Sequence, residues 1–146
     1  MKRILLLTAA LGAALMVPAA ASAQDAWVRQ VRAQLSQAGQ TFEQHGYQLT
    51  HRIYTGSLND DGEEVVELDL DVGMEYQIMG ACDTDCSDLD LVLYDGRGNV
   101  IDSDLLDDDY PVVSVEVARS GGFTVRVSMA ACSAEPCRYG IGVFGR

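Results

Sequence analysis

The sequence is poor in the side chains on which most enzyme chemistry depends. It has two histidines, His45 and His51, and a single lysine, Lys2, and no serine stands in a G-x-S-x-G pattern. A nucleophile would therefore lack the base that activates it. Paired carboxylates are common, but the single tryptophan, Trp27, offers little aromatic platform for a sugar substrate. We expect both histidines to be structural or solvated, and we expect no enzymatic activity.

Long apolar runs are absent except at the start of the chain. Lys2 and Arg3 precede an almost unbroken apolar stretch over residues 4–17, and residues 21–23 are Ala-Ser-Ala. This order of basic, apolar and small residues is typical of a signal peptide. The apolar stretch is also short for a membrane span, which needs about 20 residues. The sequence predicts a signal peptide over residues 1–23, export to the periplasm or the exterior, and no membrane insertion after cleavage.

Basic residues are scarce in the remaining 123 residues. Loss of Lys2 and Arg3 leaves eight arginines against 22 acidic residues, a net charge of −14. So acidic a surface repels phosphates, which excludes nucleic acid and anionic lipid as partners. A cation, or a basic or neutral extracytoplasmic protein or polymer, fits the charge. The length suits one domain.

Apolar residues recur at helical spacing in only one segment of the mature chain. They lie at steps of four, four, three and four, and arginine, glutamine and glutamate occupy most positions between them. The pattern predicts an amphipathic helix over about residues 25–44, within an N-terminal segment 24–46 that ends at Gly46. Its apolar stripe either packs on the domain or caps an open sheet edge, or it docks a partner. The stripe consists of Trp27, Val31, Leu35, Ala38 and Phe42.

After Gly46 the apolar period changes to two, with β-branched and aromatic residues in short runs. Turn-forming Gly, Asn and Asp residues separate the runs. Short strands without intervening helices indicate an antiparallel sandwich or barrel, here a domain over residues 47–146. We expect eight strands, at about residues 47–58, 63–71, 74–81, 89–94, 100–103, 112–118, 123–131 and 139–144.

Three of these segments carry motifs of a known family. Residues 88–95, Asp-Leu-Asp-Leu-Val-Leu-Tyr-Asp, with Gly-Asn-Val at 98–100, resemble the central motif of bacterial pre-peptidase C-terminal (PPC) domains. Residues 121–127 and 139–143 are similar to that family's last two strands, and the resemblance covers about residues 65–145. It implies a mainly β, eight-stranded antiparallel jelly-roll-like sandwich, which usually trails secreted peptidases as a non-catalytic appendage. Some members bind matrix proteins or calcium.

This chain departs from the PPC pattern in three ways. It has no peptidase domain, it begins with a helix, and it carries four cysteines that the pattern does not require. It therefore resembles a stand-alone exported version of the domain.

The connectors are expected to carry a polarised charge. Consecutive antiparallel strands place alternate connectors at the same end of a sandwich, so those after the first, third, fifth and seventh strands should lie together. At the opposite end the charges of Asp71 and Asp95 are nearly balanced by those of Arg97 and Arg119. The predicted acidic end contains Asp60, Asp61, Glu63, Asp83, Asp85, Asp88, Asp104, Asp107, Asp108, Asp109 and Glu135.

All four cysteines, Cys82, Cys86, Cys132 and Cys137, fall at that end. An even count in an exported protein predicts disulfides, and the spacings differ from the C-x2-C of a zinc knuckle. Local pairing within each connector is geometrically easy. The strand order of a jelly roll equally allows Cys82 with Cys137 and Cys86 with Cys132, which would tie the two connectors together.

The acidic end is also a candidate calcium site, because calcium prefers six to eight oxygen ligands and closely spaced aspartates supply several. The candidate ligands are Asp83, Asp85, Asp88 and Asp90, although their spacing is not that of an EF-hand loop. Alternatively, the acidic loops keep the protein soluble and Asp88 or Asp90 bonds loop amides, or the acidic end is a docking surface for a basic partner. We therefore expect an exported, non-catalytic binding or accessory module, with a structural cell-envelope protein as the alternative.

Overall fold

The protein's structure, a computed structural model, describes residues 19–146. Most of the predicted signal peptide lies outside these residues, so its cleavage stays a prediction. The described chain forms one helix and nine strands, which are α1 (Ala19–Glu43), β1 (Gln48–Leu49), β2 (Tyr54–Leu58), β3 (Gly62–Asp69), β4 (Glu75–Cys82), β5 (Cys86–Asp95), β6 (Val100–Asp104), β7 (Val112–Glu116), β8 (Gly122–Cys132) and β9 (Cys137–Gly145).

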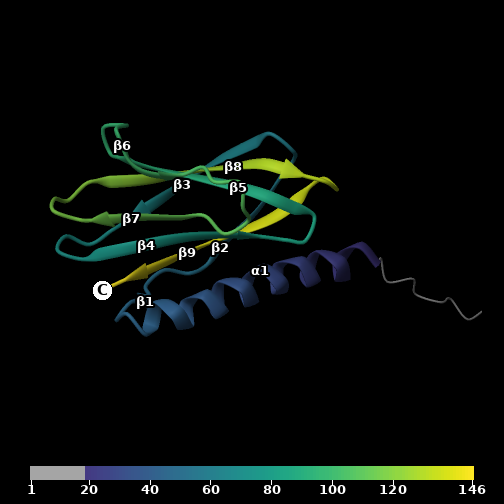
Figure 1. Cartoon of the computed structure of the whole chain (residues 1–146), viewed down its shortest axis with the longest axis horizontal. Helices are drawn as coiled ribbons and strands as arrows, with labels where there is room; N and C mark the ends of the chain where they lie inside the picture. The colour runs from purple at the N-terminus through teal and green to yellow at the C-terminus, as the bar shows by residue number, and fades with distance from the viewer. Residues whose placement is uncertain (1–18) are drawn as a thin grey trace, which may run out of the picture.

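The strands form two antiparallel sheets that face each other (Figure 1). The helix-covered sheet has the order β1-β9-β4-β7, with β2 also pairing along β9, and the open sheet has the order β3-β8-β5-β6. This confirms the predicted mainly β sandwich. The expected jelly-roll neighbours are present, because β4 pairs with β9 and β5 pairs with β8.

The strand count is nine rather than eight because the predicted strand 47–58 is interrupted. Residues 50–53 leave the ladder between β1 and β2, although both strands pair with β9. The hydroxyl and the N–H of Thr50 both donate to the carbonyl oxygen of Val143, and a ring nitrogen of His51 lies 2.9 Å from the carbonyl oxygen of Asp69. These bonds, two of which involve side chains, replace the ladder at the break.

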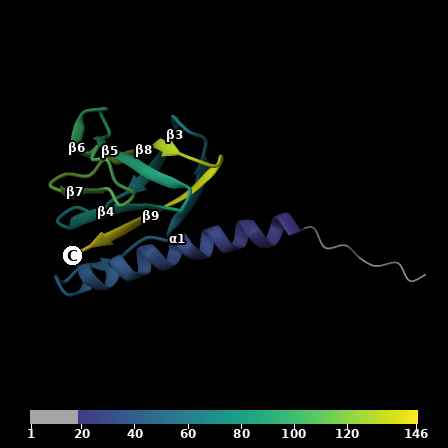
Figure 2. The ribbon, with the colours of Figure 1, turned by 45° about the vertical axis from the view of Figure 1, so that its right-hand side comes forward.

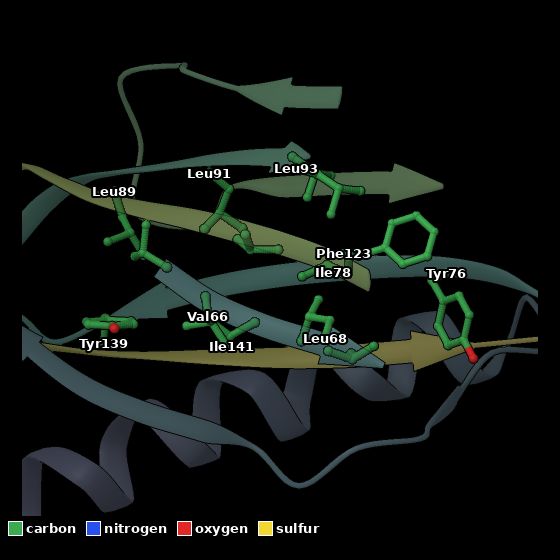
Figure 3. Close-up of a cluster of buried hydrophobic side chains, with 14 of the residues drawn as sticks. Val66, Leu68, Tyr76, Ile78, Leu89, Leu91, Leu93, Phe123, Tyr139 and Ile141 are labelled. Atoms are coloured by element: carbon green, nitrogen blue, oxygen red, sulfur yellow. The ribbon is translucent and has the colours of Figure 1, made fainter. Parts of the chain in front are cut away.

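The main core lies between the two sheets (Figure 3). Leu89, Leu91 and Leu93 on β5 are fully buried, as their alternation along the strand predicts. They face Ile78 and Ile141 of the helix-covered sheet. The sandwich therefore closes on side chains from alternate positions of both sheets.

Helix α1 packs on the outer face of the helix-covered sheet, and Figures 1 and 2 show it lying along β9. Val31 and Leu35 are fully buried, and Ala38 and Phe42 pack against them. The predicted stripe thus faces the domain, although Trp27 is only half-buried. The helix begins at Ala19, earlier than predicted, because residues 19–24 are mostly alanine, the best helix former. Within residues 19–146, no helix is long and apolar enough to span a membrane.

The helix ends in a Schellman motif. The N–H of Tyr47 donates to the carbonyl oxygen of Phe42, and the N–H of Gly46 donates to that of Glu43. Gly46 has a φ of 85°, which glycine adopts without strain. The rings of Phe42 and Tyr47 pack edge to face at 6.1 Å, so the motif also turns the chain onto the sheet.

Two glycines on β9 allow the helix to approach the sheet closely. A Cβ atom on Gly140 would lie 2.7 Å from Cγ1 of Val31 and 3.1 Å from Cδ1 of Leu35. A Cβ atom on Gly142 would lie 2.9 Å from the ring of Phe144. The glycines alternate with the inward-facing Ile141 and Val143, so one strand serves both the core and the helix.

Candidate functional site

Four connectors meet at one end of the sandwich, here called the acidic end: residues 59–61, 83–85, 105–111 and 133–136. The N–H of Asp60 donates to Glu135 Oε1 over 2.9 Å, and Asp60 Oδ1 accepts from the N–H of Cys132. The N–H of Ser133 donates to the carbonyl oxygen of Asp85, and the N–H of Leu89 donates to that of Asp108. These bonds join three of the connectors to one another and attach the fourth, residues 105–111, to β5, so the four connectors lie at one end as the strand alternation predicts.

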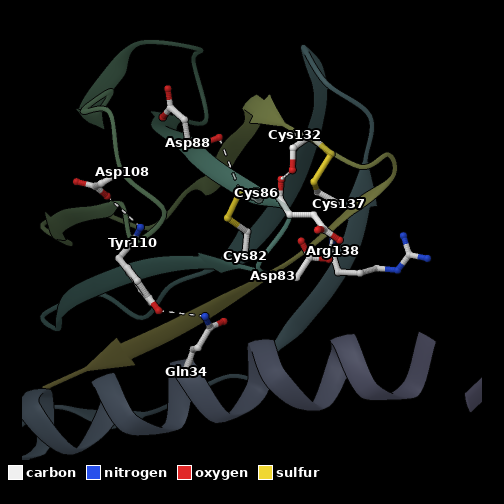
Figure 4. Close-up of a disulfide and its surroundings, with 12 residues drawn as sticks. Gln34, Cys82, Asp83, Cys86, Asp88, Asp108, Tyr110, Cys132, Cys137 and Arg138 are labelled. Carbon is white, nitrogen blue, oxygen red and sulfur yellow. Dashed lines mark hydrogen bonds between the residues drawn. A yellow bond between two sulfur atoms is a disulfide. The ribbon is translucent and has the colours of Figure 1, made fainter. Parts of the chain in front are cut away.

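Two disulfides hold this end (Figure 4). Cys82 bonds to Cys86 and Cys132 bonds to Cys137, each pair with its Cα atoms 5.9 Å apart. The structure thus has the local pairing of the two considered. Cys82, Cys86 and Cys137 are buried, so the bridges form part of the core beneath the loops.

Asp83 is the most buried of the four candidate calcium ligands, with an exposed fraction of 2%. Its Oδ2 accepts from the N–H of Arg138 over 2.8 Å, and its own N–H donates to the carbonyl oxygen of Arg138 (Figure 4). Among residues 19–146, its Oδ1 has no hydrogen-bond partner. Burial raises the pKa of this carboxyl group above its usual range.

Asp88 and Asp90 lie among further carboxylates on the other side of β5. Burial raises the pKa of Asp88 to about 6, and Asp107, Asp90 and Asp108 add to the rise. Burial and then Asp104 raise the pKa of Asp90 as well, and Arg126 opposes them. The like charges of this group repel one another, which is unfavourable for the folded state at the acidic end.

The four candidate ligands do not form one cluster. Asp83 is turned into the ladder with Arg138, whereas Asp88 and Asp90 interact with residues 104–108. In the part of the chain that the structure describes, no three His, Cys, Asp or Glu side chains form a group that could hold a metal ion. Calcium binding by Asp83, Asp85, Asp88 and Asp90 stays a prediction.

Several other aspartates bond backbone amides, the role that was considered above for Asp88 or Asp90. Asp102 Oδ2 accepts from the N–H and the hydroxyl of Ser114, over 2.7 and 3.2 Å. Asp104 Oδ2 accepts from the N–H of Val112 over 2.9 Å. Because β6 is the last strand of the open sheet and β7 the last of the helix-covered sheet, these carboxylates tie the two sheets along one edge.

The connector between β6 and β7 has a feature that the sequence analysis missed. Leu105 and Leu106 are 60% and 67% exposed, beside three consecutive aspartates at 107–109. The loop is held at Asp108, whose Oδ1 accepts from the N–H of Tyr110, and the phenol of Tyr110 accepts from Nε2 of Gln34 on α1 (Figure 4). Its signal in the sequence is two adjacent leucines in an otherwise acidic connector.

The two histidines, which the sequence analysis considered as catalytic residues, have structural partners. Nδ1 of His45 lies 2.9 Å from the carbonyl oxygen of Thr41 in the last turn of α1, and His51 bonds Asp69 as described.

Buried Tyr139 donates to Glu64 Oε2 over 2.5 Å, and burial followed by this bond raises the pKa of its phenol. Tyr54 donates to the other oxygen of Glu64. These contacts join β2, β3 and β9 at the edge of the sandwich.

The raised pKa of Asp88 predicts that stability falls as the pH rises. The unfolded carboxyl group has a pKa near 3.9, so the folded state binds more protons between about pH 4 and 6. The destabilisation by burial and by the neighbouring carboxylates therefore develops as the pH rises through about 6 and is complete about one pH unit higher. We expect Asp88→Asn to raise the free energy of unfolding at pH 7.5 by about 1 kcal/mol, after allowance for solvent screening, and to flatten its pH dependence.

Urea unfolding at pH 4.5 and 7.5 tests this expectation. Asp71→Asn, which removes the same charge from an exposed position at the opposite end, is the control. Equal effects of the two substitutions at pH 7.5 would show that net charge, rather than the surroundings of Asp88, is responsible.

Comparison with known proteins finds similarity to solved structures. No protein-family model matches the sequence, and no curated protein matches it. The fold is similar to the pre-peptidase C-terminal domain of collagenase from Bacillus anthracis, with a TM-score of 0.48 and 14% sequence identity. The similarity covers 63% of this chain and 87% of that domain. It is the domain type that the strand motifs resemble, and at this level the similarity carries nothing about ligand, partner or activity.

Proposed function

We propose that the protein is an exported, non-catalytic binding module that engages a basic, amphipathic segment of a partner protein through residues 105–110, here called the docking loop. The observation that carries this proposal is the exposure of Leu105 and Leu106, at 60% and 67%, beside the aspartates of residues 107–109. Apolar side chains displayed together in an acidic surrounding are complementary to a segment with both apolar and cationic side chains.

The energetic argument has two parts. Burial of a leucine side chain stabilises a complex by roughly 1.5–3 kcal/mol, so the two leucines supply the main attraction. The aspartates attract cationic partners over longer distances and raise the association rate. Because Asp108 already bonds Leu89 and Tyr110, binding need not order the loop first.

The disulfides support a location outside the cytoplasm, where such bonds persist. Both histidines bond backbone oxygens, which supports a non-catalytic role. The strand motifs also resemble a family of non-catalytic appendages. Calcium as a ligand and a neutral polymer as a partner are the other classes that the acidic charge allows.

Calorimetric titration with a synthetic amphipathic helix of lysine and leucine tests the proposal. We expect binding that weakens as the salt concentration rises, and no binding of the matching helix of glutamate and leucine. The variant Leu105→Ala with Leu106→Ala should bind the cationic helix about 10- to 100-fold more weakly. Leu49→Ala with Val65→Ala removes comparably exposed side chains elsewhere and should leave the affinity unchanged.

Equal loss of affinity in both double variants would contradict the proposal, since binding would then be nonspecific. Absence of binding to either helix would favour the alternative of a structural envelope protein with no discrete ligand site. Thermal unfolding with calcium, magnesium or chelator separates out the calcium hypothesis. A calcium-selective rise in melting temperature would support a site at Asp83, Asp85, Asp88 and Asp90.

A further inference from the structure

A cleft of about 490 Å³ lies at the end of the sandwich opposite the acidic end. It is formed by the β5–β6 connector, the β7–β8 connector and the adjoining strand ends. Its apolar lining includes Ile101, Val115 and Phe123, and Arg97 and Arg119 also line it. This volume is within the range of binding pockets in proteins.

The two arginines are exposed, and neither is in an ion pair with a carboxylate of residues 19–146. Two carboxylates also line the cleft. Asp95 is engaged by its own turn, because its Oδ1 accepts from the N–H groups of Arg97 and Asn99 over 2.9 Å each. Glu116 is exposed on β7. The cleft therefore offers apolar walls beside two guanidinium groups that form no ion pair within residues 19–146, although the charge of Arg97 helps to lower the pKa of Asp95.

The docking loop has the complementary chemistry. Leu105 and Leu106 suit the apolar walls, and the aspartates of residues 107–109 suit Arg97 and Arg119. The loop cannot reach the cleft of its own chain, because β6 separates them as an extended strand paired with β5. At about 3.3 Å per residue, its five residues hold the two surfaces roughly 16 Å apart.

We infer that the protein associates head to tail, with the docking loop of one copy in the cleft of the next. This inference rests on the proposed function, since it uses the same loop, and it names a second copy of the chain as a partner. The contact joins two different surfaces, so each bound copy still presents one free loop and one free cleft. Association therefore continues beyond a dimer. The net charge opposes it at long range, so it requires enough salt to screen distant charges.

Sedimentation equilibrium of the exported, oxidised protein tests the inference, at about 0.15 M salt and up to about 1 mM protein. We expect the average mass of the wild type to rise with concentration and to pass that of a dimer. Leu105→Asp with Leu106→Asp, and separately Arg97→Glu with Arg119→Glu, should each weaken association by about 100-fold or more.

An equimolar mixture of the two double variants is the sharpest test. The first retains an intact cleft and the second an intact loop, so the mixture should form a one-to-one dimer that does not grow. Leu49→Asp with Val65→Asp lies outside both surfaces and should associate like the wild type. Circular dichroism establishes that each variant is folded, and Leu→Ser and Arg→Gln replace any substitution that prevents folding.

A wild type that stays monomeric at the highest concentration, or a mixture that stays monomeric, would overturn the inference. Growth beyond a dimer in the mixture would overturn it too, because another surface would then be responsible. Failure here leaves the proposed function standing if the cationic helix still binds the wild type and depends on Leu105 and Leu106. If the wild type neither associates nor binds the cationic helix, both the head-to-tail inference and the proposed function are contradicted.

Discussion

Replacing Gly140 by valine should detach helix α1 from the sandwich and lower the free energy of unfolding by about 3 kcal/mol. The new Cβ atom alone would lie 2.7 Å from Cγ1 of Val31 and 3.1 Å from the carbonyl oxygen of Tyr54. Val31 can change its rotamer, but the Tyr54 oxygen belongs to β2, which is fixed by its ladder with β9. The helix and the edge strand must therefore move away together.

Two measurements separate helix detachment from a general loss of stability. Urea unfolding gives the change in free energy, and the fluorescence of Trp27, the single tryptophan of the chain, reports on the surroundings of α1 in the native state. Gly121→Val is the matched control, because a Cβ atom at this exposed glycine meets nothing within 4 Å. An unchanged unfolding midpoint and unchanged Trp27 emission in Gly140→Val would show that the helix does not depend on this close approach.

The position of the helix could be predicted only in part. The spacing of Val31, Leu35 and Phe42 predicts an apolar stripe that needs a partner. The receiving surface has a weaker signal, namely Gly140 and Gly142 alternating with apolar residues in the last strand. Glycines in a strand equally mark a bulge, so their meaning depended on the packing of the strand against α1.

The strands followed from the sequence because their alternation is strong and their turn residues are distinct. The break between β1 and β2 was missed, since residues 47–58 carry no glycine or proline before Gly56. It depends on the bonds of Thr50 to Val143 and of His51 to Asp69, partners that lie far away in the sequence. A local pattern contains no information about such contacts.

For the candidate site, strand alternation alone predicted which connectors meet. It did not distinguish aspartates that bond backbone amides from those that face solvent. Asp83 is buried by its contact with Arg138, and Asp102 and Asp104 bridge the two sheets. These contacts depend on which strands lie next to one another in the fold. Leu105 and Leu106 were missed, although two adjacent apolar residues in an acidic connector are a signal that the sequence contains.

Removal of the disulfides should have the second large effect on stability. The bridges join cysteines separated by 4 and 5 positions, and loops this short imply a loss of roughly 2 kcal/mol each through the entropy of the unfolded chain. We expect Cys82→Ala with Cys86→Ala to cost more than the other pair, because both of its cysteines are buried, whereas Cys132 is partly exposed. Removal of both bridges should cost about 4 kcal/mol, measured by urea unfolding.

The local pairing itself is open to a separate test, because the alternative lies close by. Cys86 and Cys132 are register partners across the β5–β8 ladder, although each is bonded to another cysteine. Cys82→Ala with Cys137→Ala leaves these two thiols facing each other, and under oxidising conditions they should form a new bond that restores part of the stability. Peptide mapping of the wild type should find only the two local bridges. A wild type with Cys86 bonded to Cys132 would contradict the local pairing, and the two connectors would then be tied together by their bridges.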